Sequence, residues 1–281
     1  MRRGARPLPP ASPRGGGRGR AAVIAPASYE EAAAALREAA AARRSLRIRG
    51  AGTKLGWAAP VDEPDVWLST RGLAAIVEHN AGDLTAVLEA GVRLEDAQDA
   101  FAEAGQMLAL DPPGAEATVG GVVATGDAGP LRHRYGGPRD LLLGATVALA
   151  DGTVARSGGK VIKNVAGYDL AKLFAGSFGT LGAIGQVVVR LHPRPPERAT
   201  VTGETDDPEE LGRAAVALAA APLELEALDV RWSRGRGALV AQAGGVALAP
   251  RIQRLRDLLG QAGLAPSVVR DDGDVWSAQR S

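Results

Sequence analysis

Glycine-rich stretches with few large side chains constrain this chain more than any other feature. Glycine accounts for 37 of the 281 residues, about 13%, where roughly 7% is usual. Many of these glycines fall in three separated stretches, residues 49–56, 112–126 and 157–185. Glycine allows positive φ and close approach of the backbone to a ligand or to another segment. We therefore expect either tight structural loops or the lining of a site for a long ligand.

The overall composition is that of a soluble globular protein with little scope for metal chemistry. Hydrophobic residues make up 46% of the chain and charged residues 23%, which excludes wholesale disorder. The absence of cysteine excludes disulfides, thiolate metal sites and iron–sulfur ligation by this chain. The three histidines, His79, His133 and His192, argue against an all-histidine metal site. Any redox chemistry therefore requires an organic cofactor.

The charge distribution separates the first 20 residues from the rest. Residues 1–20 contain six arginines and no acidic residue, so residues 21–281 carry 27 basic and 32 acidic side chains, a net charge of −5. That part has no basic stripe interleaved with aromatic residues, which argues against nucleic-acid binding. We expect residues 1–20 to be a disordered tail or the product of a misassigned start codon. They lack the apolar region of a signal peptide. We therefore expect a cytoplasmic protein that would reach the inner face of a membrane only through a complex.

Periodicity and turn residues predict an α+β domain over residues 21–193. Ser28 and Glu31 form a capping signature before an alanine-rich helix that ends at Arg43 and Arg44. Further along we expect strands at 45–49, 65–70, 74–79, 84–91, 107–110 and 184–191, a helix at 94–105, a hairpin of 141–150 with 153–156, and helical turns at 170–175. Residues 115–140 are glycine-rich and poorly periodic, so we expect an extended loop there.

A second domain is predicted for residues 194–281. The proline-rich segment HPRPPER marks a boundary near Pro193. After it we expect a βαββαβ unit with its elements at 200–203, 208–221, 225–232, 238–243, 250–260 and 266–269. Trp276 has no visible partner element, and this cap-like domain is expected to be truncated.

The first two glycine-rich stretches could bind an anion or simply turn the chain. In RGAGTKLG (49–56), Gly50 and Gly52 permit backbone N–H groups to converge, and Thr53 adds a hydroxyl. The stretch has neither P-loop nor Rossmann spacing, and a tight structural turn is the alternative. In 112–126 small residues would leave backbone amides open to a diphosphate, the alternative being a packing loop.

The third stretch contains three of the four lysines of a strongly arginine-biased chain, Lys160, Lys163 and Lys172. Each lysine alone is as readily a solvated surface charge, but their concentration beside glycines at 176, 179, 182 and 185 favours a function. Lys160 and Lys163 could stabilise negative charge on a reduced cofactor.

The order of these segments resembles a known family. RGAGTKLG, DPPGAEATVGGVVATGDAGP and GGKVIKNVAGYDLAKLFAGSFGTLGAIG resemble the FAD-binding module of the vanillyl-alcohol oxidase and p-cresol methylhydroxylase (PCMH) type, and within it the E subunits of bacterial glycolate oxidases. The resemblance implies a two-lobed FAD-binding domain with non-covalent FAD between the lobes, followed by the small cap-like domain.

The resemblance also implies cofactor contacts. The FAD diphosphate would lie against Arg49, Gly50, Ala51, Gly52, Thr53 and Lys54. Flavin and ribityl would lie against Pro112, Thr118, Val119, Gly120, Gly121, Ala124 and Gly126, with Gly167 and Tyr168 near the flavin end and Gly182 and Ile184 at the adenine. Lys163 is added as a flavin contact because of its charge, not because of the resemblance.

Departures from the family pattern bear on chemistry. Thr53 occupies the region where related proteins place a flavin-linking histidine, and Phe178 stands where the related D subunits carry glutamate. Residues 193–281 contain no histidine, so a cap-domain imidazole base for hydroxy-acid oxidation is missing. His79 and His133 remain as candidates, with a surface position the alternative for each, and the catalytic residues stay unassigned.

The resemblance implies an FAD-dependent oxidoreductase subunit that takes part in oxidising glycolate, a small 2-hydroxy acid, to glyoxylate. Electrons would pass to partners, namely a second FAD-binding glycolate oxidase subunit and an iron–sulfur subunit. A stand-alone 2-hydroxy-acid dehydrogenase and a non-catalytic FAD-binding scaffold are the alternatives.

Overall fold

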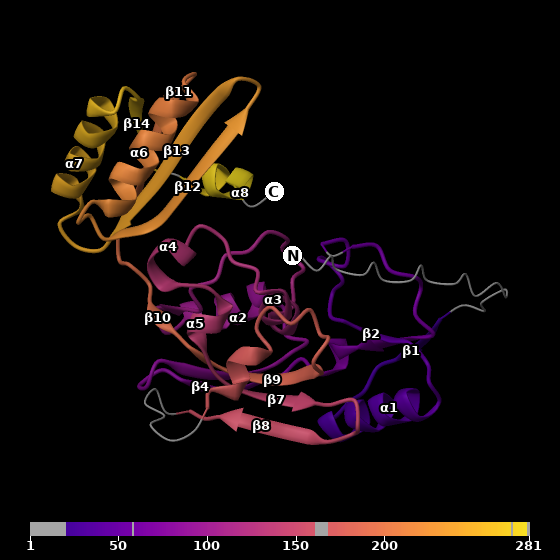
Figure 1. The fold of residues 1–281 in the computed structure, drawn as a ribbon. Coiled ribbons are helices and arrows are strands. Elements are labelled where there is room, and N and C mark those ends of the chain that lie inside the picture. Colours follow the sequence, from indigo (N-terminus) through magenta and orange to yellow (C-terminus); the bar gives the residue numbers. More distant parts are fainter. Residues whose placement is uncertain (1–20, 58, 161–167, 271, 280–281) are drawn as a thin grey trace, which may run out of the picture.

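The computed structural model describes residues 21–57, 59–160, 168–270 and 272–279. The predicted tail at 1–20 and two of the predicted site residues, Lys163 and Gly167, lie outside these ranges. The α+β class is confirmed. The chain forms two lobes and a further unit in which helices pack on a four-stranded sheet (Figure 1).

The first lobe is a small parallel sheet covered by one helix. Its strand order is β1-β3-β2, and helix α1 contacts β3 together with three strands of the second lobe. Ser28 Oγ accepts a hydrogen bond from the N–H of Glu31 at 3.1 Å, which caps α1 as predicted. Four alanines and Leu36 form the buried face of α1, so the helix packs closely on the sheet. The elements are β1 (Ala22–Ile24), α1 (Tyr29–Ala41), β2 (Leu46–Arg49) and β3 (Val66–Ser69).

The second lobe is built on a five-stranded antiparallel sheet of order β4-β5-β9-β7-β8. Its core includes Phe101, Leu88 and Val187, which are fully buried. The elements of this lobe are η1 (Thr70–Gly72), β4 (Ile76–Asn80), β5 (Thr85–Glu89), α2 (Leu94–Ala102), β6 (Gln106–Met107), α3 (Val119–Thr125), α4 (Arg132–Tyr135), α5 (Pro138–Leu141), β7 (Leu142–Ala148), β8 (Val154–Gly158), η2 (Leu170–Leu173), β9 (Ala183–Arg190) and β10 (His192–Pro193).

Two expectations for this lobe were wrong. Residues 115–140 are not an extended loop, because they contain α3, α4 and α5. Helix α3 has two glycines and three valines among its seven residues, so its helix propensity is poor. Thr118 caps its start and Gly126, with φ +69°, ends it. The strand predicted at 107–110 is shorter than expected, since β6 covers only Gln106–Met107 and pairs with β10.

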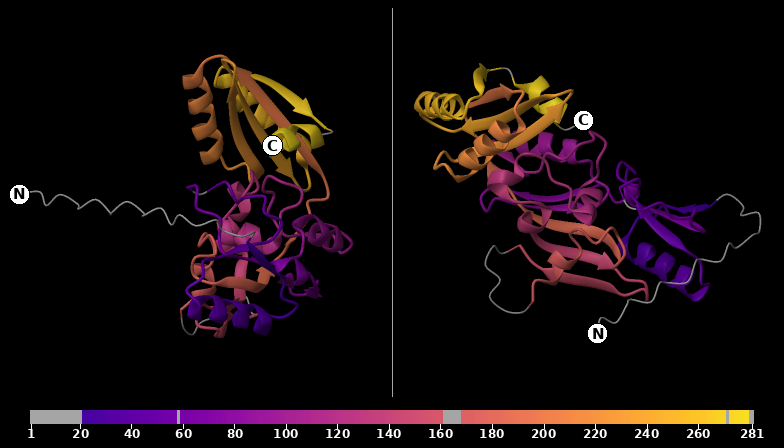
Figure 2. Two further views of the ribbon diagram at one scale, coloured as in Figure 1. Left: turned by 90° about the vertical axis from the view of Figure 1, so that its right-hand side faces the viewer. Right: turned by 45° about the horizontal axis from the view of Figure 1, so that its top comes forward.

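The remaining residues form the predicted βαββαβ arrangement. The sheet order is β12-β13-β11-β14, fully antiparallel, with α6 and α7 on one face and α8 on the other (Figure 1). Figure 2 shows this unit lying beyond α4, at the far end from α1. Its elements are β11 (Arg198–Thr205), α6 (Pro208–Ala220), β12 (Leu225–Ser233), β13 (Arg236–Gly244), α7 (Leu248–Gln261), β14 (Ala265–Val269) and α8 (Gly273–Gln279).

Trp276 does have a partner, contrary to the sequence-based expectation. It is only 5% exposed, packs with Ala227 and Val240, and donates from Nε1 to Thr200 Oγ1 at 2.8 Å. No local pattern predicts this contact, because α8 is short and Trp276 is its single buried side chain.

Asp272 accepts hydrogen bonds from Thr200 and Trp276, the two residues of the contact just described, and its titration should affect stability. Burial raises the pKa of this carboxyl, but hydrogen bonds from Thr200, Gln242 and Trp276 outweigh it, so the pKa is lowered overall. A carboxyl with a lowered folded-state pKa stabilises the fold fully above its unfolded pKa of about 3.9, and this stabilisation is lost as the pH falls through the folded value. We expect urea unfolding to show wild type more stable than Asp272→Asn at pH 6, with the difference shrinking below about pH 4. A constant difference would contradict this.

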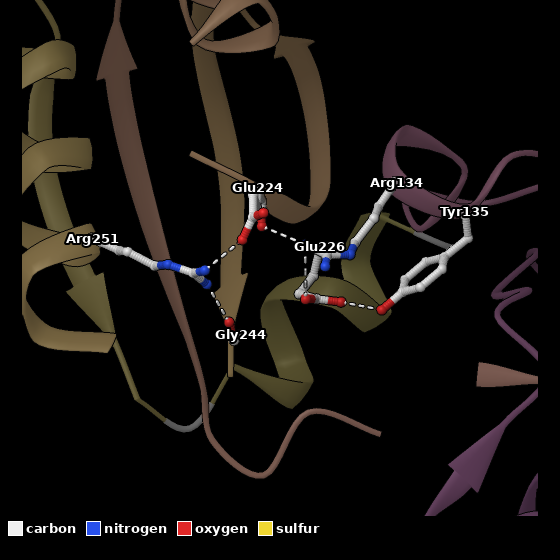
Figure 3. A network of polar contacts seen from close by, with 6 residues as sticks. All are labelled: Arg134, Tyr135, Glu224, Glu226, Gly244 and Arg251. Carbon is white, nitrogen blue, oxygen red and sulfur yellow. Dashed lines mark hydrogen bonds and ion pairs between the residues drawn. The ribbon is translucent and has the colours of Figure 1, made fainter. Parts of the chain in front are cut away.

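A polar network joins the βαββαβ unit to α4 (Figure 3). Tyr135 donates its hydroxyl to Glu226, and Arg134 donates to the Glu224 carbonyl at 2.8 Å while pairing with Glu226 at 3.5 Å. Glu226 is 4% exposed. Burial and the Glu226 carboxylate raise the pKa of Tyr135, so it keeps its proton and remains a donor.

We expect Tyr135→Phe to lower the free energy of unfolding by about 1–3 kcal/mol, because it removes a donor from a buried carboxylate. Glu224→Gln is the matched control, since the Glu224 side chain is 67% exposed in its pair with Arg251 and exposed pairs contribute about 0–1 kcal/mol. Equal losses in urea unfolding of the two variants would contradict the assignment.

Candidate functional site

A cavity of about 560 Å³ lies between the two lobes, within the size range of small-molecule and cofactor sites. One wall is β2 with the loop that follows it, and the other is α3 with the segment before β9. Twelve predicted site residues line it: Arg49, Gly50, Ala51, Gly52, Thr53, Lys54, Thr118, Gly120, Gly121, Ala124, Gly182 and Ile184.

Four predicted residues in the described chain lie outside this lining, namely Pro112, Val119, Gly126 and Tyr168. Pro112 and Val119 are buried, and Gly126 ends α3. Tyr168 is 91% exposed. Their predicted cofactor contacts stay predictions.

The two walls touch where glycine replaces a side chain. A Cβ on Gly50 would lie 2.0 Å from Thr118 Oγ1, and one on Gly120 would lie 2.5 Å from the Cβ of Ala90. Real Cβ atoms do not approach this closely, so both positions require glycine as the backbone now stands. Gly50 therefore lets the first loop approach Thr118 at the start of α3, and Gly120 lets α3 approach Ala90 directly after β5.

The loop after β2 has unused hydrogen-bond donors. Within the described chain, the backbone N–H groups of residues 51–54 have no acceptor in hydrogen-bond geometry. Gly52 has φ +84°, the left-handed region that favours glycine. Successive amides around such a residue form an anion-binding concavity. Arg49 and Arg47 on β2, both lining the cavity, add positive charge on this side.

The first turn of α3, in contrast, has no such donors. The N–H of Val119 donates to Val92 O at 2.8 Å, that of Gly120 to Ala90 O at 2.8 Å, and that of Gly121 to Thr118 Oγ1 at 3.4 Å. The amides that we expected to be open in the second stretch therefore donate hydrogen bonds within the protein. Small residues there serve close packing, and the anion donors lie in the first loop.

Sequence reasoning missed several lining residues. Arg47 lies two residues before Arg49, and both guanidinium groups lie over the Trp67 ring, at 5.2 and 5.1 Å from its centroid. Strand alternation could have predicted their shared face. Leu55, Val61 and Phe178 add exposed apolar surface to the lining. No local pattern marks Val61 as part of the site, because it reaches the cavity only through folding of the 50–65 segment.

The two lysines of the third stretch that the structure describes form ion pairs with surface carboxylates. Lys160 pairs with Glu78, and Lys172 pairs with Asp169 at 2.8 Å. Neither lysine lines the cavity, so the role suggested for Lys160 beside a reduced cofactor gains no support.

None of the three histidines lines the cavity. The Nε2 atom of His79 is 2.9 Å from Gln106 Oε1 and its ring packs edge-on against Phe101 at 4.9 Å, so His79 is tied into the fold. His133 is exposed. Burial, with Arg190 and Arg134 nearby, lowers the pKa of His192, which packs beside Tyr135. Within the described residues, no group of three or more His, Asp or Glu side chains could hold a metal ion.

Comparison with known proteins agrees with this geometry. Residues 20–158 match the sequence family described as FAD binding domain. The chain therefore carries a domain of this FAD-binding family.

Two of the similar proteins have names that refer to 2-hydroxy acids. Glycolate oxidase subunit GlcE of Escherichia coli (strain K12) is 40% identical over 152 residues, which cover 53% of this chain and 43% of that protein. D-lactate dehydrogenase of Archaeoglobus fulgidus is 39% identical over 174 residues, 61% of this chain and 39% of that protein. The chain thus spans about two fifths of the length of these relatives.

Among solved structures, p-cresol methylhydroxylase with bound substrate superposes with a TM-score of 0.77 at 17% identity, covering 92% of this chain and 60% of that one. This likeness shows a PCMH-type fold. Within the described residues no helix is long and apolar enough to cross a bilayer.

Proposed function

We propose that the cavity between the lobes binds FAD non-covalently, with the diphosphate on the loop after β2. The observation that carries this proposal is the run of free N–H groups at residues 51–54, around the left-handed Gly52, in a cavity that Arg47 and Arg49 also line. These donors suit a diphosphate, which carries anionic oxygens and needs several hydrogen bonds. A side chain that could link flavin covalently is lacking at Thr53.

The other residues of the cavity would orient the cofactor and exclude water. Thr118, Gly120, Gly121 and Ala124 would lie along ribityl and flavin, and Gly182 with Ile184 at the adenine, as the family resemblance implies. Their small or apolar side chains leave room for a flat ring system. Bound flavin would supply hydride acceptance at its ring, the chemistry needed to oxidise an alcohol carbon.

We further propose that the chain serves as an FAD-binding subunit of a complex that oxidises glycolate to glyoxylate and passes electrons to partners. The named relatives are a glycolate oxidase subunit and a D-lactate dehydrogenase, both consistent with a 2-hydroxy acid. A chain without cysteine would need a separate iron–sulfur subunit to relay single electrons, alongside a second FAD-binding subunit. A cytoplasmic complex, held peripherally at a membrane by its partners, fits this role.

One observation favours a non-catalytic FAD scaffold as the second candidate. A 2-hydroxy-acid oxidation needs a base for the hydroxyl proton, and the lining contains no histidine. Its carboxylates, Asp62 and Glu63, lie in the exposed segment after the first loop. A base from a partner subunit would reconcile this cavity with catalysis.

Turnover measurements separate these proposals. Purified chain is incubated with glycolate and an artificial electron acceptor, alone and then with its co-expressed partner subunits. Bleaching of its flavin by glycolate only in the assembled complex supports the subunit role. Turnover by the chain alone supports a stand-alone dehydrogenase, and flavin that stays oxidised in the active complex supports the scaffold.

A further inference from the structure

A buried ion pair links the two walls of the cavity. Lys54 belongs to the loop after β2, and Asp127 directly follows Gly126, the residue that ends α3. Lys54 Nζ lies 3.0 Å from Asp127 Oδ2, and the two side chains are only 6% and 4% exposed. Lys54 lines the cavity, whereas Asp127 lies behind the lining. The contact therefore joins two segments that are 73 positions apart in the sequence.

The pair is incompletely satisfied by hydrogen bonds. Nζ also donates to Thr53 Oγ1 at 3.3 Å and lies 5.7 Å from the centroid of the Trp57 ring. Asp127 Oδ2, although close to Nζ, is outside hydrogen-bond geometry with any described residue. Burial raises the pKa of Asp127, and Lys54 offsets only part of that effect. Removing one partner of such a pair is costly, because the other charge is left buried and alone.

This arrangement argues against Lys54 as a direct ligand for a phosphate. Its ammonium already faces a carboxylate at contact distance, so an anion would have to compete with Asp127 for it. The backbone N–H of Lys54, however, is among the free donors of the loop. Anchoring the side chain holds that donor, and its neighbours, in place.

We propose that Lys54 and Asp127 are positioning residues, which fix the loop at 50–54 against the end of α3 and so preorganise its amides for a diphosphate. The inference rests on the proposed FAD site. It assigns the positive charge of Lys54 to the protein's own architecture and leaves phosphate binding to the backbone. Preorganisation raises affinity by reducing the ordering cost of binding.

Binding of FAD and of ADP, which shares the diphosphate but lacks flavin, tests the proposal. Dissociation constants are measured for wild type, Lys54→Met, Asp127→Asn, the double variant and Lys54→Arg. We expect each of the first two to weaken binding of both probes by about tenfold or more. The double variant should bind no worse than either single variant, and Lys54→Arg should stay within about threefold of wild type. Lys172→Met is the matched control, because the side chains of its pair with Asp169 are 32% and 49% exposed, far more than those of Lys54 and Asp127, and it should bind like wild type.

The outcomes are distinguishable from failure of the FAD site itself. Wild type that takes up neither FAD nor ADP contradicts the proposed function. Wild type that binds FAD while Asp127→Asn binds equally or more tightly overturns only the positioning role, and tighter binding would identify Asp127 as a competitor for Lys54. If a single variant does not fold, as judged by far-ultraviolet circular dichroism of the cofactor-free protein, the double variant and Lys54→Arg carry the comparison. Additive losses in the double variant, or Lys54→Arg as weak as Lys54→Met, would also overturn it.

Discussion

Replacing Gly52 by valine will weaken the binding of flavin to the purified protein. Gly52 has φ +84°, where a β-branched residue is strongly disfavoured. An L-residue in the left-handed region costs roughly 1–2 kcal/mol, and about 1.4 kcal/mol corresponds to a tenfold change in affinity. The loop will relax to negative φ, and the amides at 51–54 will cease to converge. We expect the dissociation constant for FAD, measured by quenching of flavin fluorescence, to rise about tenfold or more.

Gly56→Val is the matched control for this prediction. Gly56 closes the same glycine-rich stretch, has no positive φ and would place its Cβ with nothing within 4 Å. The two variants therefore make the same chemical change a few residues apart. If Gly52→Val retained FAD as well as Gly56→Val did, the diphosphate would not lie on this loop.

Gly120→Val is expected to destabilise the whole flavin-binding part of the chain. The new Cβ would lie 2.5 Å from the Ala90 Cβ and 2.8 Å from the Ala90 carbonyl oxygen, and neither atom belongs to a flexible side chain. Helix α3 would have to move away from β5, breaking the hydrogen bond from Gly120 N–H to Ala90 O. Overpacking alone costs about 1–3 kcal/mol, so thermal unfolding should begin several degrees lower, with loss of flavin.

Gly212→Ala is the matched comparison, because here a side chain added to a helical glycine is expected to raise stability. Gly212 lies inside α6 on its exposed face, and a Cβ there meets nothing within 4 Å. Alanine in a helix interior is favoured over glycine by about 0.5–1 kcal/mol, so this variant should unfold at a slightly higher temperature. A Gly120→Val protein as stable as Gly212→Ala would contradict the close contact between α3 and β5.

The predictable parts of the fold are those with strong local signals. The capped helix after Ser28, the 142–158 hairpin and the βαββαβ order follow from capping, turn residues and periodicity. Helix α3 was not predicted because its glycines and valines disfavour a helix locally, and it is stabilised by two caps, by the contact with Ala90 and by burial of its valines in the core. The burial of Trp276 depends on the opposite face of a sheet formed much earlier in the sequence, so no local pattern could reveal it.

The candidate site divides in the same way. The clustering of glycines predicted both walls of the cavity, because positions where two backbones approach closely require glycine. It did not reveal which amides are free, since the acceptors for the first turn of α3 come from Val92 and Ala90. Nor could it pair Lys54 with Asp127, because this contact exists only once the lobes meet.

Visible absorption of the purified chain, with and without added FAD, tests the central claim most directly. We expect a yellow protein, or a colourless one that acquires flavin absorption on addition of FAD and keeps it through gel filtration, and heating should release FAD intact because no covalent bond holds it. A folded protein that carries no flavin, releases none on heating and takes up none from excess FAD would contradict the account.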